Sequence, residues 1–241
     1  MSSQVYEMSF GSLSLRYSFL FPQTLYYFVP RPRPVDGDEA DVRVPPDRIV
    51  LARNFFPPGS SDAYVEYRCL IELTARALLR FHASVFHAVS FVWRDRAWLL
   101  TAPSETGKTT QLLNWQRLFP GELTVISGDM PIIEAREDGG VWVHPSFWNG
   151  KERYSSRLSA KLGGLVLLRQ GEENRIERLT PRDGVAPLLF QFPVIPETEE
   201  EIRRLARLEE CLLEAAPAFC FVNLGNDAST ALLRRTLLDL C

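Results

Sequence analysis

The stretch that decides the fold is Ala97-Trp98-Leu99-Leu100-Thr101, followed at once by Ala102-Pro103-Ser104-Glu105-Thr106-Gly107-Lys108-Thr109-Thr110. The first part is a short and nearly continuous apolar run, which is typical of a strand buried on both faces. The Gly-Lys-Thr turn after it is the phosphate-binding end of the pattern G-x-x-x-x-G-K-[ST], in which backbone N–H groups hold phosphates. Ala102 stands where this pattern has its first glycine, so the neighbouring sequence has to support the interpretation.

The segments on either side of the turn do support a phosphate-binding loop. Apolar residues recur from 112 to 119 and predict a helix, which Pro120-Gly121 would end. The next β-rich run, 123 to 129, ends in Gly128-Asp129, and an acid at this place is typical of a Walker B strand, whose carboxylate meets Mg²⁺. An ordinary strand–helix–strand unit with an accidental Gly-Lys turn is the alternative. Because strand, turn, helix, strand and acid follow in order, we favour a site for a nucleotide triphosphate.

Each residue type in the turn has a part in this chemistry. The Lys108 ammonium would reach the β- and γ-phosphates, and the Thr109 hydroxyl would join Asp129 around Mg²⁺. Phosphoryl transfer depends mostly on positioning and charge neutralisation, so Lys108 and Asp129 are candidate catalytic residues. An acid is awkward beside polyphosphate, so Glu105 is expected to point to solvent. The residues expected to bind the nucleotide are Pro103, Ser104, Glu105, Thr106, Gly107, Lys108, Thr109 and Thr110.

Composition excludes several classes of protein. The chain has 241 residues, of which 46% are hydrophobic, enough for one large domain or a domain with a small lobe. Its net charge of −3 argues against a protein that binds nucleic acid by neutralising phosphates. Its four cysteines form no C-x-x-C pair, so neither a zinc site nor a disulfide framework is indicated. Without an apolar leader or a stretch of membrane-spanning length, we expect a cytoplasmic protein with no membrane partner.

Proline, glycine and aspartate divide the chain into two parts. Residues 1 to 67 are expected to form a small β-rich lobe, with strands at 13 to 17, 25 to 29 and 48 to 51 and a proline-rich loop at 30 to 47. Residues 68 to 241 are expected to form the nucleotide domain, packed with the lobe as one compact unit and beginning with a helix over 68 to 82. Further elements are expected as strands at 88 to 93, 140 to 145, 165 to 168 and 219 to 222, and as helices that start after Thr180, start after Thr198 and cover 229 to 240.

The stretch from His87 to Thr110 resembles the nucleotide core of HPr kinase/phosphorylase and its shorter HPr-kinase-like relatives. In that family a histidine opens the strand before the phosphate-loop strand, 21 residues ahead of the loop lysine, and His87 stands 21 residues ahead of Lys108. The resemblance covers roughly 85 to 190, and its two strands before the loop form a hairpin. It implies an α/β fold, the phosphoenolpyruvate-carboxykinase-like variant of the P-loop fold with a mixed sheet, here preceded by the β-rich lobe.

The resemblance also implies an activity, which is the ATP- and Mg²⁺-dependent transfer of the γ-phosphoryl group to a hydroxyl. The acceptor is expected to be a serine of a peptide or small protein, or else a small hydroxylated metabolite. The family's tendency to self-associate makes a homo-oligomer an expected state. His87 would orient Asp129 or the acceptor, whereas a partly buried structural role is the alternative for this histidine.

Two departures from the family bear on activity. The family has an Asp-Asp pair, of which one acid acts at the acceptor hydroxyl and the other helps hold metal, and Gly128 replaces the first acid here. Asp129 then does one job with help from elsewhere, or catalysis is weakened. The downstream glycine-rich signature of the full-length enzymes is also missing, which argues against HPr itself as the substrate. The chain has Trp148-Asn149-Gly150-Lys151-Glu152-Arg153 in that place, which resembles the loop of the shorter relatives.

Several assignments stay open between a functional and a structural role. Gly150, Lys151 and Glu152 could close over the acceptor, with Lys151 on phosphate oxygens and Glu152 as the missing carboxylate, or could form a polar surface turn. His82 and His144 are expected to be structural, and Glu134 to lie on the surface. A nucleotide-binding regulatory or scaffold protein without turnover is the competing function. Ala102 and Gly128 favour it, whereas an intact Lys108-Thr109 and an acid at 129 favour the enzyme.

Overall fold

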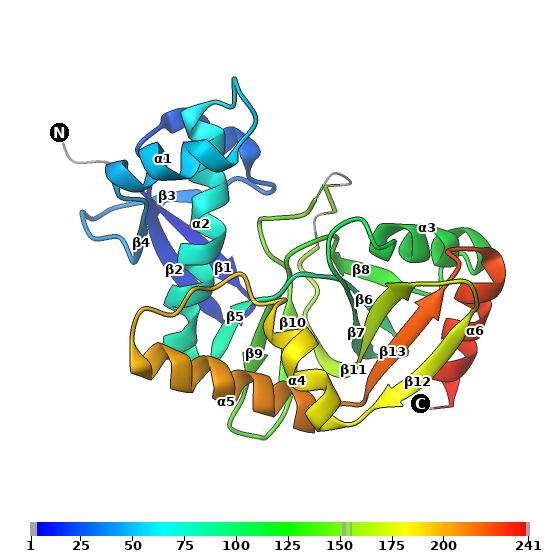
Figure 1. Cartoon of the computed structure of the whole chain (residues 1–241). Helices are drawn as coiled ribbons and strands as arrows, with labels where there is room; N and C mark the ends of the chain where they lie inside the picture. Colours follow the sequence, from blue (N-terminus) through cyan, green and yellow to red (C-terminus); the bar gives the residue numbers. More distant parts are fainter. Residues whose placement is uncertain (1–3, 151–152, 155, 240–241) are drawn as a thin grey trace.

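The computed structural model describes residues 4–150, 153–154 and 156–239, and within these it contains two sheets (Figure 1). The smaller sheet lies in the N-terminal lobe, has the order β3-β1-β2-β4 and comes before the larger one. Its strands are β1 (Val5–Phe10), β2 (Leu13–Ser18), β3 (Arg33–Val35) and β4 (Val42–Arg43). The molecule is thus a mixed α/β protein with a small four-stranded sheet ahead of a larger mixed sheet.

The larger sheet has nine strands and contains the expected hairpin. β6 (Ala88–Trp93) and β7 (Arg96–Thr101) pair antiparallel, whereas β7 runs parallel to β11 (Ala160–Gln170). The order is β5-β9-β10-β11-β7-β6-β8, with β13 beside β11 and β12 beside β13. The remaining strands are β5 (Ala83–Val85), β8 (Thr124–Ser127), β9 (Ile132–Ala135), β10 (Val141–His144), β12 (Arg175–Leu179) and β13 (Ala218–Asn223).

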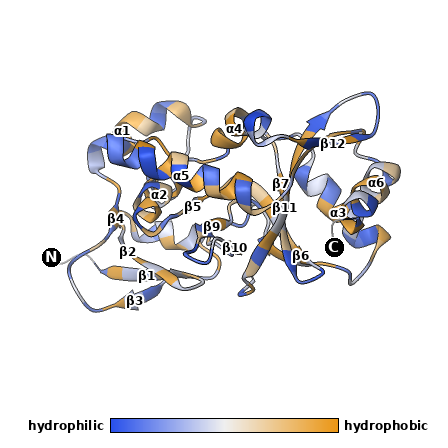
Figure 2. Cartoon of the chain, turned by 90° about the horizontal axis from the view of Figure 1, so that it is seen from below, coloured by the Kyte–Doolittle hydropathy of each residue, from blue (hydrophilic) through white to orange (hydrophobic). Residues whose placement is uncertain are grey.

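Helices cover the two faces of this sheet (Figure 2). α3 (Lys108–Leu118) and α6 (Asp227–Leu238) lie on one face, and α4 (Pro181–Leu189) and α5 (Glu199–Ala215) on the other. The alternation of side chains along β7 explains its apolar run. Trp98 and Leu100 pack into the core under α3 and α6, whereas Leu99 packs into the core under α4 and α5. Both faces of β7 are buried, as the sequence predicts.

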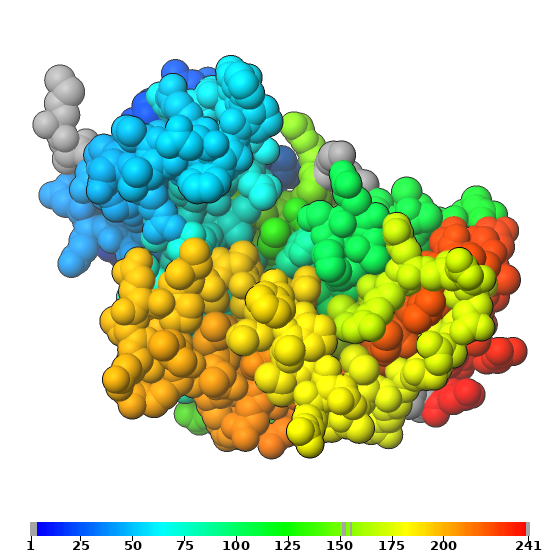
Figure 3. Space-filling view, viewed as in Figure 1, coloured from blue at the N-terminus to red at the C-terminus, as the bar shows by residue number. Residues whose placement is uncertain are grey.

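The lobe shares a core with the larger sheet through α2 (Asp62–Leu78). Buried residues of β1, β2 and α2 join Met130, Ile132 and Trp148 in a single apolar cluster. In the space-filling view the blue and cyan surface of the lobe meets the orange surface of α5 directly (Figure 3). The short helices of this region are η1 (Pro22–Tyr27), α1 (Pro46–Ala52), η2 (Arg53–Phe55) and η3 (Leu79–Phe81).

Three expectations for the lobe are wrong. The apolar run 25 to 29 is not a strand, because η1 occupies Pro22–Tyr27 and the carboxylate of Glu66 accepts the N–H groups of Leu20 and Phe21 ahead of it. The run 48 to 51 lies in helix α1, whose start has proline at its first position. The long helix begins at Asp62 rather than at residue 68, with the Ser61 side chain as its N-cap, so the expected boundary at 67 falls inside it.

One side chain on β9 also differs from expectation. Glu134 is buried rather than on the surface, and its carboxylate lies 3.0 Å from His144 Nε2 and 2.7 Å from Arg136 Nε. His144 is fully buried in this network, which is a structural role. The helices that the structure describes include none that is both long and apolar enough to cross a membrane.

Candidate functional site

The loop between β7 and α3 forms the centre of the site. Ala102, the residue in place of the first consensus glycine, is fully buried and belongs to the core under α3 and α6. Its methyl group therefore packs into the protein interior. Ala102 directly follows the end of β7 and is separated in the sequence from the Gly107-Lys108-Thr109 turn that would face a phosphate.

The backbone of this loop is arranged as an anion site. Glu105 and Gly107 have φ angles of 65° and 104°, so the chain turns through the left-handed region twice within three residues. Gly107 is the N-cap of α3 and offers no side-chain cap, which leaves the first N–H groups of the helix for a ligand. The Thr106 hydroxyl donates to the carbonyl of Pro103 at 2.8 Å and holds the loop together. The Glu105 side chain is exposed, as expected.

Lys108 lies at the mouth of this loop. Its ammonium is 8% exposed and donates to the carbonyl oxygens of Ala102 at 2.8 Å and Pro103 at 3.3 Å. Burial lowers its pKa, and the carboxylate of Asp129 acts in the opposite direction. Since a buried cation benefits from anionic partners, phosphate oxygens would be favourable replacements for the two carbonyls.

His87 and Asp129 meet beside this lysine. His87 Nε2 lies 3.5 Å from Asp129 Oδ1, and the backbone of both residues is fixed, since the Ala88 N–H donates to the Asp129 carbonyl at 2.8 Å. Burial, together with the nearby Lys108 cation, lowers the pKa of His87 to about 4. The imidazole is therefore neutral near pH 7, and it meets the carboxylate as a dipole rather than as a cation.

Gly128 has no room for a side chain. A Cβ atom there would lie 2.8 Å from the carbonyl oxygen of Asn149 and 2.9 Å from the ring of Tyr154. The Asn149 carbonyl and the Tyr154 ring therefore occupy the space that a side chain at position 128 would need. A second carboxylate next to Asp129 would require these two groups to shift.

The oxygen ligands near the loop suit Mg²⁺ held together with phosphates. Among the described residues no group of three or more His, Cys, Asp or Glu side chains could hold a metal ion. The expected pair, Asp129 and the half-buried Thr109, would supply two oxygens. This number is sufficient, because Mg²⁺ keeps several waters and is usually bound by one or two protein oxygens plus substrate phosphates.

A pocket of about 460 Å³ opens at Asp129. Gly150 of the expected acceptor loop lies in its wall, whereas Lys151 and Glu152 fall outside the described residues. Its other residues come from the lobe, from α2 and from either side of Gly150 in the sequence: Tyr27, Val29, Tyr64, Tyr67, Arg68, Ile71, Phe147, Trp148, Asn149 and Arg153.

Sequence reasoning missed the α2 wall of this pocket. Tyr64, Tyr67 and Arg68 lie three and four positions apart, so they share one face of the helix. This spacing predicts a shared helix face only if the helix includes residue 64, and the helix expected from the sequence begins at residue 68.

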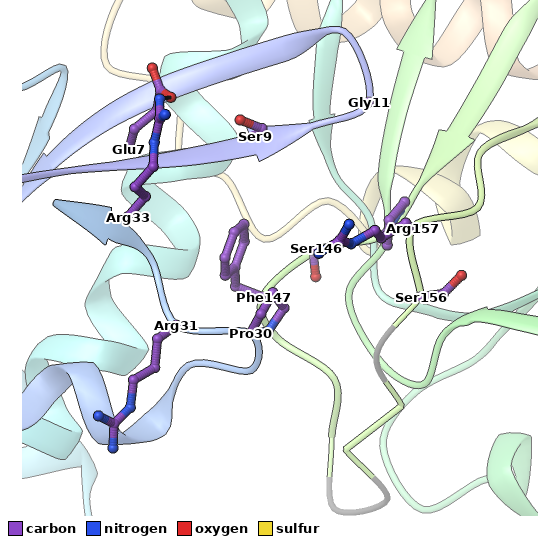
Figure 4. A pocket seen from close by; sticks show the side chains of 11 residues that line it. Glu7, Ser9, Gly11, Pro30, Arg31, Arg33, Ser146, Phe147, Ser156 and Arg157 are labelled. Atoms are coloured by element: carbon purple, nitrogen blue, oxygen red, sulfur yellow. Dashed lines mark hydrogen bonds and ion pairs between the residues drawn. The ribbon is translucent and has the colours of Figure 1, made fainter. Parts of the chain in front are cut away.

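A second hollow of about 640 Å³ lies on the lobe side of Phe147 and contains none of the expected site residues (Figure 4). Its charged residues are Glu7, Arg31, Arg33 and Arg157. Arg33 is paired with Glu7 at 2.5 Å, and the side chain of Arg31 points away from the hollow. Of the expected site residues, Asp129 and Gly150 line the smaller pocket.

Comparison with known proteins gives a similarity in structure. By sequence, the chain matches no family model and no curated protein. By structure, it is similar to the HPr(Ser) kinase/phosphatase from Coxiella burnetii, with 12% sequence identity and a TM-score of 0.36. The match covers 65% of this chain and 92% of that chain. This structural match is with an HPr kinase/phosphatase, the family whose motifs the sequence resembles.

Proposed function

We propose that this protein is an ATP- and Mg²⁺-dependent phosphotransferase that moves the γ-phosphoryl group to a hydroxyl, either of a serine in a peptide or small protein or of a small metabolite. The observation that carries the proposal is the meeting of Lys108, Asp129 and His87 at the mouth of the β7–α3 loop. The fold that we propose for residues 68 to 241 is the phosphoenolpyruvate-carboxykinase-like variant, in which the β6–β7 hairpin is an expected feature.

Each residue of the site has a task in this proposal. The N–H groups of residues 104 to 109 and the Lys108 ammonium hold the phosphates, and Thr109 and Asp129 hold the metal. When bound, Mg²⁺ would neutralise charge on the transferring group. Asp129 also accepts the proton of the attacking hydroxyl, and neutral His87 keeps the carboxylate oriented.

A nucleotide-binding regulatory protein without turnover is the second candidate, and the crowding at Gly128 favours it. The blocked position leaves one carboxylate for two tasks, which would slow transfer. Both candidates use the same loop, so nucleotide binding alone does not separate them.

The first experiment measures Mg²⁺-dependent ATP consumption by the purified protein, with phosphorus NMR to identify products, alone and with serine peptides and small alcohols. Lys108→Ala should abolish nucleotide affinity, because it removes the point charge on the β- and γ-phosphates. Lys161→Ala, on β11, is the matched control and should bind nucleotide normally. Unchanged ATP binding by Lys108→Ala would overturn the site, and binding without transfer to any acceptor would favour the regulatory protein.

Asp129→Asn tests the carboxylate. Nucleotide binding measured without metal should be near that of the wild type, because the loop and Lys108 are unchanged. Transfer should fall by at least about a hundredfold, since the variant loses both the proton acceptor and a metal ligand. A fully active Asp129→Asn protein would assign both tasks to another group.

A further inference from the structure

The pocket at Asp129 has the size of a small-molecule site. Its volume of about 460 Å³ lies within the range of roughly 300–1,000 Å³ that ligand pockets cover. Its walls include residues of η1 and α2, residues 147 to 150 and Arg153, so the lobe and the larger sheet both contribute to it.

One wall of the pocket is aromatic. The ring of Tyr27 lies 5.4 Å from that of Tyr64 and 5.3 Å from that of Tyr67, and the Tyr67 ring lies 6.4 Å from Trp148. These rings form a continuous apolar surface beside the reactive carboxylate. They suit the carbon skeleton of a bound molecule.

The charged lining of the pocket is mainly positive, although the whole chain is negative. Asp129 is the acid in the lining, and two exposed arginines, Arg68 and Arg153, face it. Burial raises the pKa of the Tyr67 hydroxyl to about 12, and both arginines and Asp129 also act on it. Arg68 further lowers the pKa of His87. The two guanidinium groups and the Asp129 carboxylate are therefore close enough to act electrostatically on the same neighbouring side chain.

The wall also holds polar atoms without partners. The indole N–H of Trp148 and the Oδ1 atom of Asn149 are buried and have no hydrogen-bond partner among the described residues. Asn149 uses only its amide nitrogen, which donates to the carbonyl of Val29 at 2.7 Å. Both atoms lie beneath the pocket surface, so the polar contacts of a ligand fall to the two exposed arginines.

We infer that this pocket takes a small hydroxylated acceptor that carries an anionic group, with its carbon skeleton on the tyrosine wall and its anion between Arg68 and Arg153. The inference rests on the proposed function. In the transfer step the acceptor oxygen forms a bond to the γ-phosphorus and the bond from that phosphorus to the β-phosphate oxygen of ADP breaks. The hydroxyl proton passes to the carboxylate of Asp129. Carboxylate and phosphate share the required chemistry, since both accept two hydrogen bonds from a guanidinium group.

The test compares acceptors in matched pairs that differ in charge. The pairs are glycerate and glycerol, N-acetyl-L-serine and N-acetyl-L-serinamide, and 4-(hydroxymethyl)benzoate and benzyl alcohol, with glycerol 3-phosphate as the phosphate arm. Binding is measured without nucleotide by saturation-transfer NMR, and transfer is measured by phosphorus NMR. At least one anionic member should bind about tenfold more tightly than its neutral partner, the scale of one charge-assisted hydrogen bond.

Two substitutions locate the anion. Arg68→Gln and Arg153→Gln should each raise the acceptor KM about tenfold or more while the ATP KM stays the same. Arg182→Gln, an exposed arginine on α4, is the matched control and should change neither. Both test positions are exposed, so these variants are expected to fold.

The outcomes separate this inference from the proposed function. If ATP is consumed in a Lys108-dependent way but neutral and anionic acceptors are equal, the inference is wrong and the kinase stands. The same conclusion follows if a peptide with an internal serine is phosphorylated and no small anion competes with it. If small anions bind in an Arg68-dependent way but no ATP is consumed, the pocket stands as an anion site and the kinase is wrong.

Discussion

At Gly128 the space into which a side chain would project is filled by the Asn149 carbonyl and the Tyr154 ring. Gly128→Ala should therefore destabilise the protein by about 1–3 kcal/mol, the usual cost of overpacking, because the Asn149 carbonyl is a backbone atom that cannot rotate away. Urea unfolding measures this loss. Gly128 has no left-handed φ angle, so backbone strain does not add to this loss. A loss below about 0.5 kcal/mol, the usual size of a surface substitution, would contradict the crowding.

The same crowding decides what Gly128→Asp would do. The change introduces the acid that HPr kinases carry at this place, but we expect lower stability and no gain in transfer, because the new side chain has to displace the Asn149 carbonyl and the Tyr154 ring. A gain in phosphoryl transfer would show that these two groups move aside.

His87 should give the stability of the protein a pH dependence. Its pKa is about 4 in the folded protein and ordinarily 6.5, so the unfolded chain binds the proton more readily between these values. Stability should therefore fall as the pH drops from 6.5 to 4, by up to about 3 kcal/mol. The measurement is urea unfolding at several pH values for the wild type and His87→Gln, which should lack this part of the slope.

His82→Asn, at an exposed histidine, is the control for this series. Identical slopes for the wild type and His87→Gln would contradict the buried neutral imidazole. Turnover near that of the wild type in His87→Gln would assign this residue a structural role.

The residues of the site differ in how far the sequence could predict them. Lys108, Asp129 and His87 follow from the order of strand, turn and strand, because consecutive elements of the sheet bring them together. Arg68 and Tyr67 do not, because their approach to Asp129 depends on how α2 packs against the larger sheet, to which no local pattern refers. Glu134 was expected on the surface because it lies beyond the strand that ends at Asp129. It is buried instead because it pairs with His144 on the next strand, a contact to which no local pattern refers.

At the scale of elements, α5 carries a buried acid that should weaken the fold at alkaline pH. Glu209 is 5% exposed, its Oε1 atom has no partner among the described residues, and burial raises its pKa to about 7. The folded protein then holds the proton between pH 4.5 and 7, so stability falls as the pH rises through this window.

Glu209→Gln should remove that loss. At pH 8 the variant should be more stable than the wild type by about 1–3 kcal/mol, and at pH 5 the two should be nearly equal. Thermal unfolding at both pH values is the measurement. Glu210→Gln, at the exposed neighbour, should show no such change, and a pH-independent effect at Glu209 would contradict the ionisation argument.

The elements that could be predicted are those whose signals are local. The capping box of Thr198 and Glu201, the β6–β7 hairpin and the two-faced strand β7 all occur as expected. The apolar run 25 to 29 predicts a strand from its local sequence. It does not form one, and the buried Glu66 carboxylate, which is distant in the sequence, accepts the N–H groups of Leu20 and Phe21 just before the short helix η1. Short strands such as β5 have too few residues to show an alternation of apolar and polar side chains, and their structure depends on pairing with a neighbouring strand, which is β9 for β5.

At the scale of the whole molecule, we expect one cooperative unfolding transition, because the lobe and the larger sheet share an apolar cluster. Far-UV circular dichroism and tryptophan fluorescence should give coincident urea curves. Trp148 reports on the shared cluster, whereas Trp93, Trp98 and Trp115 report on the core under α3 and α6. A Trp148→Phe variant separates these reporters, and two resolved transitions would contradict a shared core.

The position of α2 has a consequence for how this protein can diverge. The buried face of this helix packs against the rest of the lobe, and Tyr67 and Arg68 on another face line the pocket. The loop that would hold the phosphates lies in a different stretch, from 102 to 109. The residues that would bind the phosphoryl donor and those that would bind the acceptor thus lie in separate parts of the chain. Substitutions in the lobe and in α2 should therefore change which acceptor binds without changing the residues that hold the phosphates.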